Sequence, residues 1–121
     1  MKSALRVNAY SAGERLQILE LCLLHLVKKG ATKPGVDHRL VLAGDLNQAL
    51  AHHKVTDIST WGYPKSSFGG FASILDHLKE TDFVDKKNGV YVVTPKGLRY
   101  MRECSKRLRM AAAKISCDVL D

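Results

Sequence analysis

The stretch VDKKNGVYVVTPKG, residues 84–97, decides the fold because it joins a hairpin signal to a helix start. Asn88-Gly89 lies between two β-favouring segments and suits a type I′ turn, in which both central residues need a positive φ angle. The pattern predicts a tight β-hairpin whose tip carries Lys86 and Lys87.

The residues that follow the hairpin predict a helix N-terminus. Thr94 is a good N-cap, and Pro95 is suited to the first helical position, where a missing N–H costs nothing. We expect one C-terminal helix within residues 95–119.

The N-terminal part of the chain predicts another helix. Ser11 and Glu14 have the spacing of a capping box, and the strong helix formers that follow continue to Lys29. Apolar residues cover more than one side of this segment, which is typical of a helix buried on more than one side. Either it crosses the centre of the domain or it also faces a second subunit.

The middle of the chain alternates helical and irregular segments. Residues 39–42 are a short strand or the first turn of a helix that covers 45–53, and residues 54–64 are irregular. A further helix is expected from about residue 65 to residue 82. Its apolar positions fall on one side: Phe68, Phe71, Ile74, Leu75 and Leu78.

This order of elements is that of a winged helix domain with helical extensions. The segments SSFGGFASILDHLKETDFV, DKKNGVYVVT and TPKGLRYM resemble the second half of winged helix-turn-helix transcriptional regulators of the multiple-antibiotic-resistance or phenolic-acid type. LVLAGDLNQALAHH is similar to the short strand and second helix of that fold. The expected fold class is therefore mainly α with a small β-hairpin. Residues 1–121 form one domain, with a winged helix core over 11–94. One departure is the long link over 54–64, where a compact helix-turn-helix has about 3–4 residues.

The net charge of +7 on 121 residues indicates an anionic partner. The resemblance implies that the exposed face of the 66–80 helix enters the DNA major groove and that the hairpin tip contacts phosphate or the minor groove. That face lacks the Arg, Lys, Asn and Gln side chains that read bases, and it carries Asp76 and Glu80. We therefore expect phosphate contacts to dominate.

The candidate nucleic-acid-binding residues are basic or small polar side chains on the hairpin, on the two helices beside it and around the irregular segment. They are Lys54, Lys65, Ser66, Ser67, Ser73, His77, Lys86, Lys87, Asn88, Arg99, Arg102, Lys106 and Arg109. Arg99, Arg102, Lys106 and Arg109 form one stripe if the last helix is continuous. The alternative for this helix is a solvated surface with no partner.

The last helix also carries an apolar seam at 3–4 spacing that predicts dimerisation. Its residues are Leu98, Met101, Leu108, Ala112 and Ile115. The resemblance implies a homodimer. The alternative is that this seam folds back on the helix over residues 14–29.

The sequence offers no pattern for catalysis, a cofactor or a metal. It lacks a nucleophile elbow, a P-loop, a dinucleotide-type glycine pattern and an HExxH motif. The three cysteines are widely spaced and form no zinc-ligand pattern. The longest apolar run, around residues 16–27, is shorter than the ~20 residues of a membrane span. We expect a soluble cytoplasmic protein that is not an enzyme.

The sequence thus predicts a small transcriptional regulator that binds double-stranded DNA, in which case it would associate with the nucleoid. Two alternatives stay open. One is a winged helix interaction module, an adaptor or inhibitor, that binds an acidic protein. The other is RNA or ribosome binding through the same basic surfaces.

Overall fold

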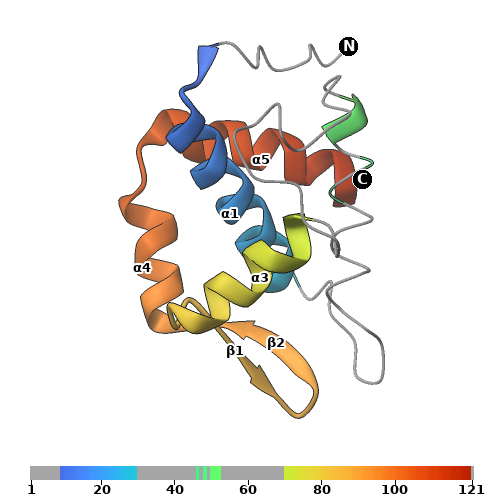
Figure 1. Cartoon of the computed structure of the whole chain (residues 1–121), viewed down its shortest axis with the longest axis vertical. Helices are drawn as coiled ribbons and strands as arrows, with labels where there is room; N and C mark the ends of the chain where they lie inside the picture. The colour runs from blue at the N-terminus through green and yellow to red at the C-terminus, as the bar shows by residue number, and fades with distance from the viewer. Residues whose placement is uncertain (1–8, 30–45, 47, 49, 53–69, 121) are drawn as a thin grey trace.

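The computed structural model describes residues 9–29, 46, 48, 50–52 and 70–120 (Figure 1). Its elements, in order, are α1 (Ala12–Lys28), α3 (Gly70–Glu80), β1 (Val84–Lys87), β2 (Val90–Val93), α4 (Pro95–Glu103) and α5 (Lys106–Leu120). Residues 46, 48 and 50–52 are also helical, within the helix expected over 45–53. The predicted mainly α class with a small hairpin is confirmed. The possible strand over 39–42 and the irregular segment over 54–64 lie outside the described residues.

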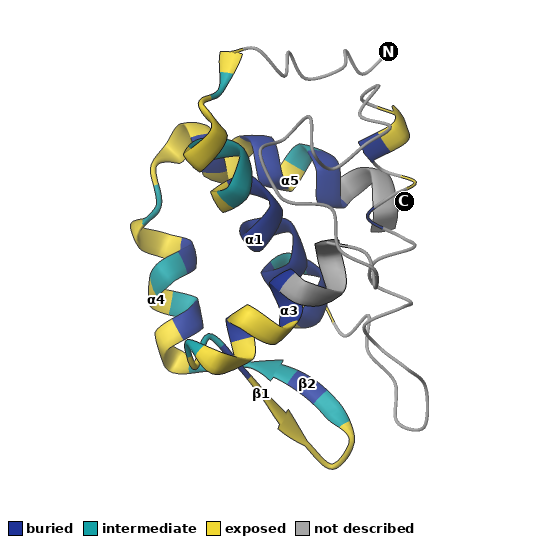
Figure 2. Cartoon of the chain, viewed as in Figure 1, coloured by how far each residue is buried: buried dark blue, intermediate teal, exposed yellow. Residues whose placement is uncertain are grey.

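Helix α1 forms the centre of the fold. The predicted capping box is present: the Ser11 hydroxyl accepts from the Glu14 amide at 3.2 Å, and the Ser11 amide donates to Glu14 Oε1 at 2.9 Å. From Ile18 to Val27 every residue except His25 is buried. Figures 1 and 2 show α1 crossing the molecule between the other elements, and it packs against α3, α4, α5 and β2. A central position therefore accounts for its apolar sides.

The end of α3 directs the chain into the hairpin. Leu75 and Leu78 are buried on one side of this helix, as its sequence pattern predicts. Asp82 has a φ angle of 64°, and the Phe83 amide donates to the Leu78 carbonyl at 2.8 Å. This left-handed residue after the helix is a common C-cap geometry, and it reverses the chain within three residues.

The hairpin is the predicted one. The strands are antiparallel, with Val84 opposite Val93 and Lys87 opposite Val90. The turn residues Asn88 and Gly89 have φ angles of 52° and 77°, the positive values that a type I′ turn needs.

The junction between the hairpin and α4 is tightly packed. The Thr94 hydroxyl accepts from the Gly97 amide at 3.0 Å, so Thr94 is the N-cap and Pro95 the first helical residue, as predicted. A Cβ atom at Gly97 would lie 2.2 Å from the Phe83 carbonyl oxygen. Glycine is therefore needed at this position because the backbone of the hairpin base occupies the space of a side chain.

The expectation of one continuous helix over 95–119 differs from the structure. Helix α4 ends at Glu103, and Cys104 after it has an extended backbone with a ψ angle of 152°. Ser105 then acts as the cap of α5: its hydroxyl accepts from the Leu108 amide at 3.4 Å, and its carbonyl accepts from the Arg109 amide at 3.0 Å. Serine is favoured at this N-cap position because its hydroxyl accepts a hydrogen bond from an amide that has no partner within the helix.

Candidate anion-binding surfaces

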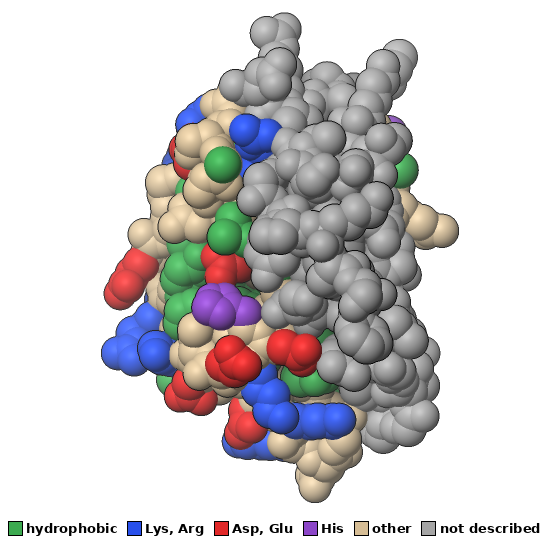
Figure 3. All heavy atoms as spheres, viewed as in Figure 1, with side chains coloured by type: hydrophobic (Ala, Val, Ile, Leu, Met, Phe, Trp, Pro, Cys, Tyr) green, Lys and Arg blue, Asp and Glu red, His purple; other side chains and the backbone are tan. Residues whose placement is uncertain are grey.

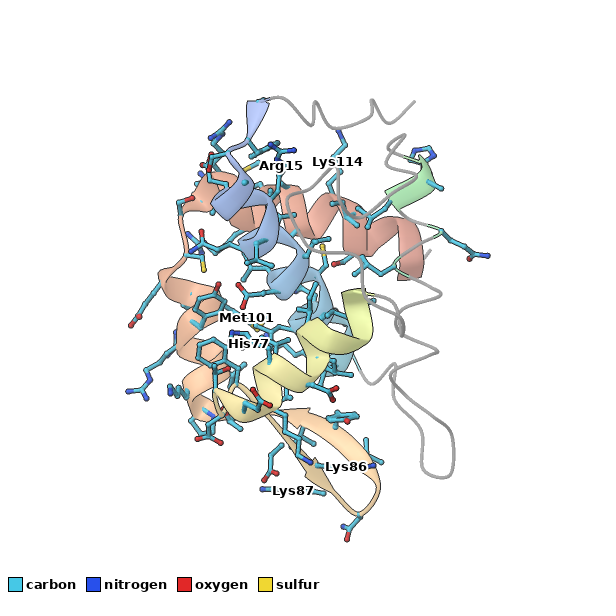
Figure 4. The ribbon with its side chains drawn as sticks, in the orientation of Figure 1. Arg15, His77, Lys86, Lys87, Met101 and Lys114 are labelled. Atoms are coloured by element: carbon cyan, nitrogen blue, oxygen red, sulfur yellow. The ribbon has the colours of Figure 1, made fainter. Side chains whose placement is uncertain are left out.

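The tip of the hairpin is the first basic surface, and we name Lys86, Lys87 and Asn88 the wing tip. All three residues are exposed. Lys86 Nζ lies 5.7 Å from the centre of the Tyr91 ring, and the Lys86 amide donates to Asp85 Oδ1 at 2.8 Å. In Figure 4 the labelled residues Lys86 and Lys87 lie on the hairpin, which projects from the helical body. The wing tip therefore presents two cations to solvent at one end of the molecule.

Helix α4 begins beside the base of the hairpin. Lys96 Nζ lies 5.6 Å from the centre of the Phe83 ring, and this ring stacks on Tyr100 with 4.6 Å between the ring centres. Arg99 is exposed on the same helix. The start of α4 thus adds cations to those of the wing tip.

The outward face of α3 has mixed charge. Asp76, His77 and Glu80 are exposed, as predicted, and so is Lys79, which the sequence-based interpretation had not included. Figure 3 shows acidic side chains beside basic ones over this lower part of the molecule. Two carboxylates and one lysine make a poor surface for reading bases.

Several predicted contact residues cannot be placed on these surfaces. Lys54, Lys65, Ser66 and Ser67 lie outside the described residues, and the side chain of Ser73 is not described.

A second basic surface is a pocket where the last turn of α1 meets α4 and α5. We name it the basic pocket, and its volume is about 480 Å³. It is lined by His25, Lys28, Leu98, Met101, Arg102, Lys106, Arg109, Met110 and Ala113. No acidic residue is among the described residues that line it.

The cations of the basic pocket are unpaired within the described part of the chain. Lys28, Arg102, Lys106 and Arg109 are exposed, and none forms an ion pair or a side-chain hydrogen bond with another described residue. His25 is partly buried, and its desolvation is the main cause that lowers its pKa. The positive charges of Lys28 and Lys29 lower the pKa of His25 further. The histidine is therefore neutral near pH 7, and the positive charge comes from the lysines and arginines.

The break between α4 and α5 changes the predicted basic stripe. Arg102, Lys106 and Arg109 line the basic pocket together, whereas Arg99 does not. The sequence-based interpretation missed His25, Lys28 and Met110, the last of which is 62% exposed. Lys28 gave no sign of a pocket in the sequence, because a basic side chain in the last turn of a helix is already favoured by the helix dipole.

Arg107 has a different environment from its basic neighbours. Its guanidinium pairs with Glu14 Oε2 at 2.9 Å, donates to the Ala9 carbonyl and lies 4.4 Å from the centre of the Tyr10 ring. These contacts attach the start of α5 to the start of α1. Arg107 is therefore a structural residue in this fold.

The predicted dimerisation residues are mostly buried in the hydrophobic core of the single chain. Leu98 is partly buried, and the other four are buried beside α1 or in the common core: Met101, Leu108, Ala112 and Ile115. Helices α1 and α5 pack on one another, and the Cys22 thiol contacts the Ala112 carbonyl at 3.7 Å. The seam thus folds back on α1, the alternative considered above, and the homodimer stays a prediction.

A buried polar cluster connects α1 to α4. The Tyr100 hydroxyl donates to Glu20 Oε1 at 3.0 Å, and Glu20 is 9% exposed. Desolvation raises the pKa of the Glu20 carboxyl, against the lowering effects of the Tyr100 hydrogen bond and the charge of His77. Burial, followed by the charge of Glu20, raises the pKa of Tyr100, which remains a neutral donor.

Other kinds of site are not found in the described part of the chain. No three potential metal ligands among the described residues lie together, and no described helix is both long and apolar enough to cross a membrane. Compared with known protein families, curated proteins and solved structures, the chain shows no match.

Proposed function

We propose that this protein binds double-stranded DNA through phosphate contacts and acts as a small transcriptional regulator with a winged helix domain. The observation that supports this most is the wing tip, which holds two exposed lysines on a β-hairpin with a tight Asn88-Gly89 turn. The hairpin follows α3 after three residues, the arrangement expected of a wing beside a groove-binding helix.

The charges on the surface favour affinity over sequence reading. Lys86, Lys87 and Arg99 are exposed cations suited to phosphate, and the Asn88 amide adds a hydrogen-bond donor. The outward face of α3 carries Asp76 and Glu80, which a polyanion repels. We therefore expect similar affinities for unrelated duplexes.

The wing tip can be tested by removing its charges. Lys86→Gln/Lys87→Gln is expected to weaken binding to every duplex alike. The negative slope of log affinity against log salt should become shallower by about 2, since each lost phosphate contact removes about 0.9 from its magnitude. The measurement is a fluorescence anisotropy titration with two unrelated duplexes at several salt concentrations.

The control variant is Lys114→Gln, at the opposite end of the molecule in Figure 4. It removes one charge away from the hairpin and is expected to leave the salt slope nearly unchanged. If the wing-tip variant keeps the wild-type affinity and slope, the wing tip is not the DNA contact.

A further inference from the structure

The basic pocket combines two kinds of surface that one simple anion does not need together. Its lining includes the apolar side chains of Leu98, Met101, Met110 and Ala113. Its four cations come from three helices, with no acidic residue among the described lining residues. A ligand that matches this pocket carries both an apolar group and several negative charges.

The apolar part of the lining argues against DNA as the occupant. A duplex presents phosphates at its surface, and these satisfy the cations but leave the apolar side chains in contact with water or sugar. Met110 is 62% exposed, which sets it apart from the other large apolar side chains whose burial the structure describes. Methionine adapts its shape to different apolar partners and is common at protein-binding surfaces.

The number of cations argues against a ligand with a single carboxylate. One carboxylate among Lys28, Arg102, Lys106 and Arg109 would leave several like charges close together without compensation. Several carboxylates on one occupant neutralise them all. A peptide segment supplies this combination because acidic and apolar side chains alternate along it at short range.

We propose that the basic pocket docks an acidic, amphipathic segment of a partner protein. In this arrangement one or two apolar side chains of the segment contact Met101 and Met110, and its Asp or Glu side chains pair with Arg102, Lys106 and Arg109. The lysine and arginine stems extend the apolar contact while their charged groups stay at the rim. This is the helix-in-groove mode of recognition, with charge complementarity that selects acidic segments.

The test uses the full chain and three synthetic peptides of equal length. The first has Leu and Phe at helical spacing i, i+3, i+4 and i+7, with Glu at the other positions. In the second peptide Ser replaces the apolar residues, and in the third Lys replaces Glu. Binding is measured by isothermal titration calorimetry at moderate salt, and we expect the first peptide to bind at least ten times more tightly than either of the others.

Three variants then locate the binding surface. Arg102→Gln/Arg109→Gln removes two rim charges, and Met110→Gln removes an apolar contact without a change of charge. All three side chains are exposed, so the fold is expected to be retained, as circular dichroism can verify. We expect the first variant to bind the acidic amphipathic peptide at least tenfold more weakly than wild type does, and the second at least threefold more weakly. The third variant, Lys86→Gln/Lys87→Gln, also removes two charges, and its affinity for the acidic amphipathic peptide is expected to differ from that of wild type by less than twofold.

Three results would overturn the proposal. Equal binding of the first and second peptides would show that only charge matters. An equal effect of the wing-tip and pocket variants would show attraction without a specific site. Displacement of the peptide by duplex DNA, together with loss of duplex binding in Arg102→Gln/Arg109→Gln, would assign the pocket to nucleic acid.

Discussion

Glu20 and Tyr100 join the centre of α1 to α4 through a hydrogen bond in a largely apolar environment. A buried carboxyl is destabilised in its charged form unless it is well paired, and here burial has the largest effect on its pKa. The free energy of unfolding should therefore depend on the protonation of this one residue. The dependence can be isolated by comparison with a side chain that does not titrate.

Glu20→Gln keeps the shape and an acceptor for the Tyr100 hydroxyl. The pKa of Glu20 is raised in the folded state, so its contribution to stability is fully present below the unfolded-state pKa of about 4.3 and is lost as pH rises through the folded-state pKa. The stability of the variant relative to wild type should therefore increase between about pH 4 and pH 8. Urea unfolding of both proteins over this range provides the measurement, and a difference that is constant or falls with pH would contradict the prediction.

At the scale of elements, the hairpin and α4 depend on a close approach of their backbones. The Phe83 carbonyl accepts from the Thr94 amide at 3.1 Å and also lies against Gly97. Val93 Cγ1 would be 2.8 Å from a Cβ at position 97. A side chain can turn aside, but the carbonyl oxygen is fixed by its hydrogen bond. The orientation of the hairpin relative to α4 thus depends on the absence of a side chain at this position.

Gly97→Ala is therefore expected to destabilise the fold by about 1–3 kcal/mol, the usual range for an overpacked site. Gly13→Ala is the matched control, since apart from its chain neighbours and the backbone of its own helix no atom lies within 4 Å of a Cβ at Gly13 in α1. The control should be neutral or stabilising by up to about 1 kcal/mol, because alanine favours a helix more than glycine does. Equal stabilities of the two variants in urea unfolding would show that the close approach is not rigid.

At the scale of the whole molecule, the sequence predicts features that depend on a few neighbouring residues, but it does not predict features that depend on the packing of distant segments. The capping box at Ser11, the turn at Asn88 and the helix start at Thr94 were predicted because each signal lies within a few residues. The break at Ser105 was not, since the apolar spacing continues through it and one serine is its only local sign. The basic pocket could not be predicted because it joins Lys28 to residues 70 or more positions later, and only the packing of α1 against α4 and α5 brings them together.

The proposed DNA contact involves only exposed cations, which lie on the hairpin and at the start of α4. A protein that binds duplex DNA in this way, with few base contacts, has a dissociation constant of about 1–100 µM near physiological salt, and its affinity rises steeply as salt falls. Its affinities for unrelated sequences should agree within a few-fold, because phosphate contacts carry no direct sequence information.

The most direct test is an anisotropy titration of wild-type protein with two unrelated labelled duplexes, from low to physiological salt. We predict saturable binding to both duplexes with nearly equal affinities and a log–log salt slope of about −2 or steeper, which corresponds to at least two phosphate contacts. Absence of binding at low salt, or binding that does not change with salt, would contradict the proposal that this protein binds DNA.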